Sequence, residues 1–252
     1  MSGYTDFASF YDRLTGDVGY PQRAGYLAGL LAENGVEKGT VLDLACGTGS
    51  LTLELARRGY EMIGVDASPD MLCVAREKCM QAGADVLFLC QAMEALDLYG
   101  TVNAAVCTLD SLNHITDPDT LREVFRRVSL FLEPGGLFIF DVNTPYKHRE
   151  ILGDNTFVYD LDGLYCVWQN AYDAQDDTVA ILLDFFEEGE DGSYTRSGEQ
   201  FAERAYSHET LCALLDDVSL SLIGFYEEMM RTPPQKDTQR AVYLVKKERI
   251  QG

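Results

Sequence analysis

The residues best suited to chemistry lie at positions 41–50, which read VLDLACGTGS. An apolar run leads into Gly47-x-Gly49, and leucines follow, which indicates a buried strand, a tight turn and a helix. Glycines at such a turn let a ligand reach the backbone N–H groups at the start of the helix, because no side chain intervenes. The segment therefore predicts a ligand-binding turn.

Two further residues indicate what kind of ligand this turn binds. A dinucleotide-binding turn has a third small residue that lets helix and strand pack closely around a pyrophosphate, and Thr52 occupies that place here. Asp43 puts a carboxylate inside the strand, which suits a ligand with a cation at its near end better than a pyrophosphate. A nicotinamide-dependent oxidoreductase is therefore the less favoured alternative.

Asp66 ends a second apolar stretch, residues 62–65. A carboxylate at the end of this strand can accept hydrogen bonds from both hydroxyls of a ribose. The alternative is that Asp66 caps the next helix, but Ser68 and Pro69 already supply a cap and a first helical residue. The ribose role is thus the favoured interpretation.

A polar cluster follows a fourth strand, at 103–108. In open α/β sheets, ligands bind beyond the carboxyl ends of the strands, so Asp110 and Asn113 are candidate substrate-binding residues. His114 is a candidate general base, because imidazole groups titrate near neutrality. Alternatively, His114 orients the substrate or caps the loop. The other histidines, His148 and His208, are expected at the solvated surface.

Composition excludes several classes of function. The net charge is −21 in 252 residues, so a nucleic acid or an anionic membrane would be repelled. No apolar run approaches the ~20 residues of a membrane span, and no signal pattern starts the chain, which predicts a cytosolic protein. The seven cysteines form no CxxC pair. We expect them to be buried thiols, with neither disulfides nor a metal site.

The elements that must position these residues alternate between apolar strands and amphipathic helices. They predict an α/β fold with a Rossmann-like, seven-stranded, mostly parallel sheet, helices on both faces and one antiparallel strand near an edge. Residues 143–206 instead have the alternating pattern of a β-meander. We therefore predict a body formed by 1–142 and 207–252, interrupted after the fifth strand by an antiparallel lobe at 143–206. A further short amphipathic helix is expected at 7–14.

Residues 41–50, 62–71, 103–114 and 132–141 together resemble the motifs of class I S-adenosylmethionine-dependent methyltransferases. The likeness is greatest to small-molecule enzymes such as glycine N-methyltransferase and the amino-sugar N-methyltransferases, which also carry a lobe after the fifth strand. It implies S-adenosylmethionine as cofactor and in-line transfer of a methyl group to a small molecule. Nitrogen is favoured over oxygen as the target, because an amine needs only to be unprotonated whereas a hydroxyl group would need a base or a metal. A module that binds the cofactor without transferring its methyl group is the alternative. The resemblance does not indicate an oligomeric state.

The same resemblance assigns residues to the cofactor. Tyrosines of the leader are expected to close over its methionine end as a lid, although their rings could simply pack a first helix on the core. At the adenine edge the family often has an aspartate, from which Ala92 departs. The implied cofactor-binding residues are Tyr11, Tyr20, Asp43, Ala45, Gly47, Gly49, Asp66, Ala67, Met71, Gln91, Ala92, Met93 and Leu109.

The lobe at 143–206 is expected to cover the acceptor site. Trp168, the only tryptophan, is a candidate wall of that site or equally a core residue. Arg204 and Tyr206 are candidates for holding an acidic or hydroxylated acceptor.

Overall fold

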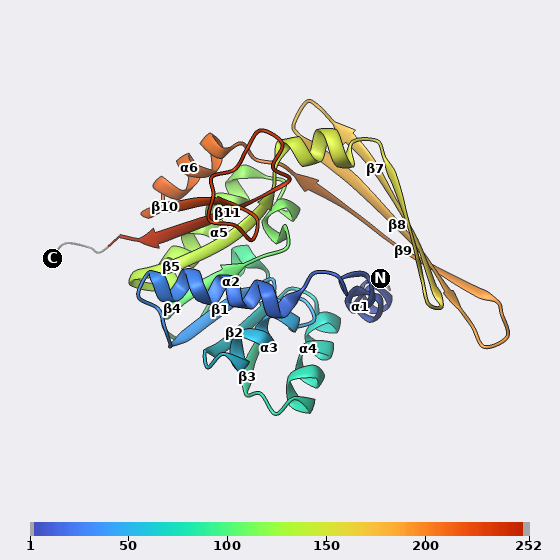
Figure 1. Cartoon of the computed structure of the whole chain (residues 1–252), viewed down its shortest axis with the longest axis horizontal. Coiled ribbons are helices and arrows are strands. Elements are labelled where there is room, and N and C mark those ends of the chain that lie inside the picture. The colour runs from blue at the N-terminus through green and yellow to red at the C-terminus, as the bar shows by residue number, and fades with distance from the viewer. Residues whose placement is uncertain (1–2, 249–252) are drawn as a thin grey trace.

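The computed structural model describes residues 3–248, and its centre is a seven-stranded sheet (Figure 1). The strand order is β10-β11-β5-β4-β1-β2-β3. Only β11 runs antiparallel to its neighbours, which confirms the predicted sheet with one antiparallel strand near an edge. The strands are β1 Thr40–Leu44, β2 Glu61–Asp66, β3 Val86–Cys90, β4 Val102–Cys107, β5 Leu132–Asn143, β10 Leu220–Glu227 and β11 Arg240–Lys247.

Helices cover both faces of this sheet because successive strand residues point to opposite sides. Leu42 and Phe138 pack with α5 and α6, whereas Val41 and Ile139 pack with α2 and α3. The predicted cap is confirmed, because the hydroxyl of Ser68 accepts an N–H at the start of α4. The hydroxyl of Ser207 caps α6 in the same way. The helices are α2 Tyr20–Glu33, α3 Ser50–Arg57, α4 Pro69–Gln81, α5 Pro118–Phe131 and α6 His208–Asp216, with short 3-10 turns η1 Met93–Ala95 and η2 Ser111–His114.

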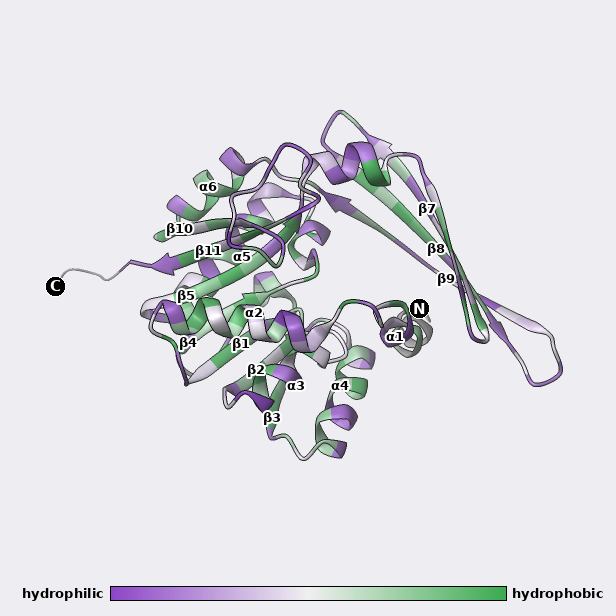
Figure 2. Ribbon diagram, in the orientation of Figure 1, coloured by the Kyte–Doolittle hydropathy of each residue, from purple (hydrophilic) through white to green (hydrophobic). Residues whose placement is uncertain are grey.

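A second, four-stranded antiparallel sheet extends from the body after β5, in the order β6-β7-β8-β9. A π-helix, η3 (Lys147–Leu152), leads into it. Buried and exposed residues alternate along the strands, so one face of the sheet is apolar. Figure 2 shows green, hydrophobic stretches along β7 and β8. The strands are β6 Thr156–Leu161, β7 Leu164–Asp173, β8 Thr178–Glu188 and β9 Tyr194–Arg204.

The apolar face of this second sheet is covered by α1 (Gly3–Leu14) and η3. Phe10 of α1 is buried against Phe185 of β8, with ring centroids 5.4 Å apart. Leu152 of η3 joins the same cluster. The leader helix therefore completes the core of the second sheet, and it also contacts α4 of the body.

Two glycines allow a test of how closely the glycine turn packs. Gly49 (φ 72°) and Gly83 (φ 68°) are both left-handed, but a Cβ at Gly49 would lie 2.8 Å from that of Ala75, whereas Gly83 faces open space. Gly83→Ala should cost ~1–2 kcal/mol of unfolding free energy. Gly49→Ala should cost a further ~1–3 kcal/mol because α4 must move. If urea denaturation gives equal losses of unfolding free energy for the two variants, α4 can move away from residue 49 at no cost.

Candidate active site

The glycine turn is held in shape by the carboxylate of Asp66. Its two oxygens accept the N–H groups of Gly47 and Ser68, each at 2.8 Å. Burial raises the pKa of Asp66, while these N–H groups oppose the shift. Because Ser68 itself supplies the side-chain cap of α4, Asp66 is not that cap. The carboxylate has further acceptor capacity for a ligand hydroxyl, and the ribose role stays a prediction.

Asp43 lies beneath the turn and is almost fully buried. Burial raises its pKa to about 7; the hydrogen bond from the Thr52 hydroxyl opposes this shift and the Asp66 carboxylate adds to it. Thr52 therefore serves as the hydrogen-bond partner of Asp43. A cation bound nearby would stabilise the ionised carboxylate.

The leader helix brings its tyrosines to the same turn. A small cavity of about 30 Å³ is lined by Tyr11, Tyr20, Asp43, Ala45, Gly47 and Leu109, all predicted cofactor residues, together with neighbours such as Thr108 and Ser111. Burial raises the pKa of Tyr11, so its phenol remains protonated. The Tyr20 hydroxyl donates to that of Thr15 at 3.2 Å. The structure thus gathers six of the expected residues around one small space.

Asp12, which sequence reasoning missed, fastens α1 over the turn. One of its oxygens accepts the Thr48 hydroxyl at 2.6 Å and that of Ser50 at 3.3 Å. Its other oxygen lies 2.7 Å from the Lys78 ammonium of α4. The leader is therefore attached to both sides of the glycine turn.

The remaining predicted cofactor residues lie further along the strand ends. Met71 is buried in the first turn of α4, and Ala67 is exposed beside Asp66. Gln91 does not extend toward a ligand: its amide accepts the Asp97 N–H at 2.9 Å and donates to the Asp97 carbonyl at 3.1 Å. Its side chain closes the loop that also holds Ala92 and Met93. Contacts from these two residues to adenine remain predictions.

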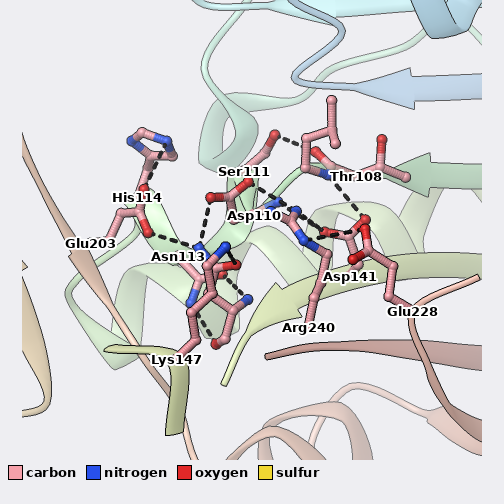
Figure 3. Close-up of polar contacts among 12 residues, drawn as sticks. Thr108, Asp110, Ser111, Asn113, His114, Asp141, Lys147, Glu203, Glu228 and Arg240 are labelled. Carbon is pink, nitrogen blue, oxygen red and sulfur yellow. Dashed lines mark hydrogen bonds and ion pairs between the residues drawn. The ribbon is translucent and has the colours of Figure 1, made fainter. Parts of the chain in front are cut away.

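The loop after β4 is held by the carboxylate of Asp141 at the end of β5 (Figure 3). Leu109 and Asp110 both have left-handed backbones, with φ of 58° and 57°. Asp141 accepts both of their N–H groups, at 3.0 and 2.9 Å. It is 1% exposed and is paired with Arg23 at 3.2 Å and Arg240 at 2.9 Å. The loop conformation therefore depends on a buried ionic network.

Asp110 is kept charged by its neighbours. Burial alone would raise its pKa, but Arg240, 3.0 Å away, and Lys147 hold the pKa well below the usual range. The Asn143 amide donates to Asp110 at 2.7 Å. Position could have revealed Asp141 and Asn143, because they end the fifth strand at the same edge of the sheet where Asp110 follows the fourth. Arg240 starts the antiparallel β11 and pairs with Asn143, so it lies at the same edge.

A larger cavity of about 520 Å³ separates this loop from the second sheet. Leu109, Asp110 and His114 line it from the body, and Trp168 lines it from β7. The Trp168 ring is fixed by a 2.7 Å hydrogen bond to Asn170. The structure thus brings three of the predicted acceptor-side residues, Asp110, His114 and Trp168, to one pocket.

Three other predicted substrate residues do not line that pocket. Asn113 is fully buried and donates to the carbonyls of Asn143 and Arg204, at 3.1 and 2.8 Å. The Arg204 guanidinium donates to the Thr116 carbonyl, and the Tyr206 hydroxyl donates to the Ile115 carbonyl. The expectation that these side chains hold an acceptor is wrong on geometry, because each is used to anchor the loop that carries His114.

The histidines also differ from expectation. His148 and His208 were expected at the surface, but His148 is fully buried and lies 3.4 Å from Glu203, because η3 packs it under β9. His208 is half-buried, stacked on Phe225 with centroids 4.2 Å apart. Only His114 is exposed. It stacks on Phe201 with centroids 4.9 Å apart, and its Nε2 lies 3.9 Å from a Glu203 oxygen.

The cysteines are only partly as expected. Cys73 and Cys90 are exposed, which contradicts their assignment as buried thiols, because each falls on the outward side of its element. Within residues 3–248, no group of three or more His, Cys, Asp or Glu side chains is placed to hold a metal ion. Over the same residues, no helix is both long and apolar enough to span a membrane.

Comparison with known proteins identifies the class to which this fold and site belong. A sequence profile of the methyltransferase domain matches residues 41–136. The structure also resembles the crystal structure of an S-adenosylmethionine-dependent methyltransferase from Clostridium acetobutylicum ATCC 824, with a TM-score of 0.88 and 35% identity over 97% of this chain and 99% of that chain. The chain belongs to the class I S-adenosylmethionine-dependent methyltransferases, and the resemblance seen in its motifs is confirmed.

Within this class, the chain is 31% identical to the putative methyltransferase YqeM of Bacillus subtilis (strain 168), over 97% of each chain. It shares its fold with S-adenosylmethionine-bound CalS10, an amino pentose methyltransferase from Micromonospora echinaspora, at a TM-score of 0.76 and 18% identity, covering 94% of this chain and 96% of that chain. The protein is therefore an enzyme that uses S-adenosylmethionine.

The buried charge of Asp43 predicts a pH-dependent stability. Its folded-state pKa of about 7 exceeds the ordinary 3.8, so the folded protein binds more protons between these values. The contribution of Asp43 to the unfolding free energy is therefore lost as pH rises from about 4 to about 7. Asp43→Asn should gain stability relative to the wild type across that window, reaching on the order of 4 kcal/mol. A pH-independent difference in urea denaturation would contradict this.

The contacts of Asp12 predict that α1 loosens when they are removed. Asp12→Ala loses an ion pair and two hydroxyl contacts, worth ~1 kcal/mol in this half-exposed position. Amide hydrogen exchange within residues 8–14 should become roughly fivefold faster. Asp85→Ala removes an equal charge from an exposed loop and serves as the control. Unchanged exchange in Asp12→Ala would show that Phe10 alone holds the helix.

Proposed function

We propose that the protein transfers the methyl group of S-adenosylmethionine to a nitrogen atom of a small molecule bound in the 520 Å³ cavity. The main support for this proposal is that the two cavities are adjacent. Tyr11 and Leu109 line both the small cavity at the glycine turn and the larger cavity under the second sheet. A methyl group at the first cavity would face an acceptor in the second. The covering sheet and α1 favour a small acceptor over a macromolecule.

The residues around the glycine turn fit the cofactor. Asp66 offers two oxygens to ribose hydroxyls, and Asp43 lies where a cationic methionine end would stabilise its charge. Tyr11 and Tyr20 would close over that end from α1. When bound, S-adenosylmethionine supplies an electrophilic methyl group on a good leaving group. The chain then has to align the acceptor and exclude water, which can be worth ~7–11 kcal/mol.

Nitrogen suits this site better than oxygen because of the base available. An amine needs only to give up the proton of its ammonium form before its lone pair attacks, and an imidazole can accept that proton. A hydroxyl group holds its proton far more strongly, so imidazole alone would activate it poorly. The fold shared with an amino pentose methyltransferase agrees with an amine acceptor.

His114 would accept that proton. It is exposed to the cavity from the loop after β4, and the buried carboxylate of Glu203 lies behind it (Figure 3). Glu203 is itself held by the Asn143 amide at 3.1 Å and lies 3.4 Å from His148. We assign Glu203 as a positioning residue that orients His114.

Steady-state transfer of labelled methyl groups to a panel of small amines tests the function and His114 together. His114→Asn should lower kcat by at least ~10² and remove the pH–rate limb near neutrality, while cofactor affinity holds. Glu203→Gln should lower kcat less, by roughly tenfold, again without changing cofactor affinity. His208→Asn is the matched control, since that ring lies outside the cavity.

Two other outcomes have distinct meanings. If His114→Asn raises the acceptor KM with kcat and the pH profile intact, the imidazole positions the acceptor and solvent takes the proton. If the wild type binds the cofactor but methylates no amine while methylating the matching alcohols, the nitrogen assignment is wrong.

A further inference from the structure

The face of β9 that points into the acceptor cavity carries an unusual pattern. Glu199, Phe201 and Glu203 alternate along the strand, so all three project to the same side and line the cavity. The rest of this inner face is apolar, with Leu183 opposite Glu199 and Ile181 opposite Phe201. Two carboxylates on one face of β9 therefore border the cavity.

Acidic side chains outnumber basic ones among the described residues around this cavity. The acidic residues that line the cavity are Asp17, Asp110, Glu199 and Glu203. The basic residues are Lys147 and Arg240, and His114 also lines it. Four carboxylates against Lys147 and Arg240 leave an excess of negative charge. The cavity would therefore attract a cation and repel an anion.

Both basic side chains are already engaged by the protein. Arg240 lies 3.0 Å from Asp110, 2.9 Å from Asp141 and 3.4 Å from Glu228. The Lys147 ammonium donates to the Asn143 side chain at 2.9 Å, and burial together with Arg240 lowers its pKa. A carboxylate or phosphate on an acceptor would have to displace these contacts. Arg204, the cation first expected here, points instead to the Thr116 carbonyl.

Aromatic rings form the remaining wall. Trp168 meets Phe157 edge-on, with centroids 6.1 Å apart, and lies 6.3 Å from Tyr159. Phe201 completes the wall beside His114. Such rings bury an apolar body and attract an ammonium to their faces.

We propose that the acceptor is a cationic amine with an apolar or aromatic body, and that Glu199 with Glu203 selects it over anionic molecules of the same shape. The proposal rests on the proposed function and names its substrate class. The amine enters as an ammonium and loses one proton to His114 or water. Its lone pair then forms the N–C bond as the S–C bond breaks, and the bonding electrons leave with sulfur. The methylated ammonium product retains one positive charge at neutral pH.

Equilibrium binding of three probes of similar size tests this selection. They are 2-phenylethylamine, 2-phenylethanol and 3-phenylpropionate, each titrated calorimetrically into protein saturated with S-adenosylhomocysteine and into protein without it. The amine should bind at least about tenfold more tightly than the carboxylate, the equivalent of one charge contact. Raising the salt concentration should reduce the difference in affinity between the amine and the carboxylate.

Variants separate this effect from the net charge of the chain. Glu199→Gln should weaken amine binding by roughly fivefold to tenfold and leave the alcohol unchanged. Glu187→Gln on the neighbouring β8 is the matched control, because Glu187 is exposed and lies outside the cavity. Circular dichroism and S-adenosylhomocysteine affinity check that both variants fold.

Equal affinities for amine and carboxylate, tighter binding of the carboxylate, or binding of none of the three would overturn the proposal. Equal losses of amine affinity in Glu199→Gln and Glu187→Gln would also overturn the proposal, because the preference would then come from the overall charge of the chain and not from the cavity. Failure of the proposed function gives a different result: no methyl transfer to any amine, with the charge preference of the cavity still measurable.

Discussion

The carboxylate of Asp141 is the group on which both halves of the site depend. It accepts the N–H groups of Leu109 and Asp110, whose left-handed backbones each carry a cost of ~1–3 kcal/mol. Arg23 of α2 and Arg240 of β11 neutralise its buried charge. One buried carboxylate thus joins three elements of the sheet domain, β5, α2 and β11, to the loop that carries Leu109. Leu109 can then serve as a wall of both cavities.

Much of the fold could be predicted because its signals are local. The strand, turn and helix around Gly47 and Gly49 lie within one short segment, and Asp66 ends the next strand, so position alone implied that they meet. Amphipathic spacing predicted helices between the strands, and the cap at Ser68 marked the start of α4. The same positional rule, applied to the fifth strand, would have found Asp141 and Asn143.

The acceptor side was harder to predict because its contacts join distant segments. Glu203 meets His114 and His148 only because β9 folds back over the body, and nothing near Glu203 in the sequence indicates this. Alternation along β9 also matters: Glu203 points inward, so the neighbouring Arg204 points away from the cavity. The net charge of the chain indicates which partners it would repel but not where its carboxylates lie, and a few of them line the cavity.

The leader helix belongs to two structural units at once. Through Asp12 it is bonded to the glycine turn and α4, and through Phe10 it completes the apolar core of the second sheet. Tyr11, between them, lines both cavities. A displacement of α1 would therefore open both cavities together. Under the proposed function, the exchange of the cofactor with solvent would then be coupled to the exchange of the acceptor.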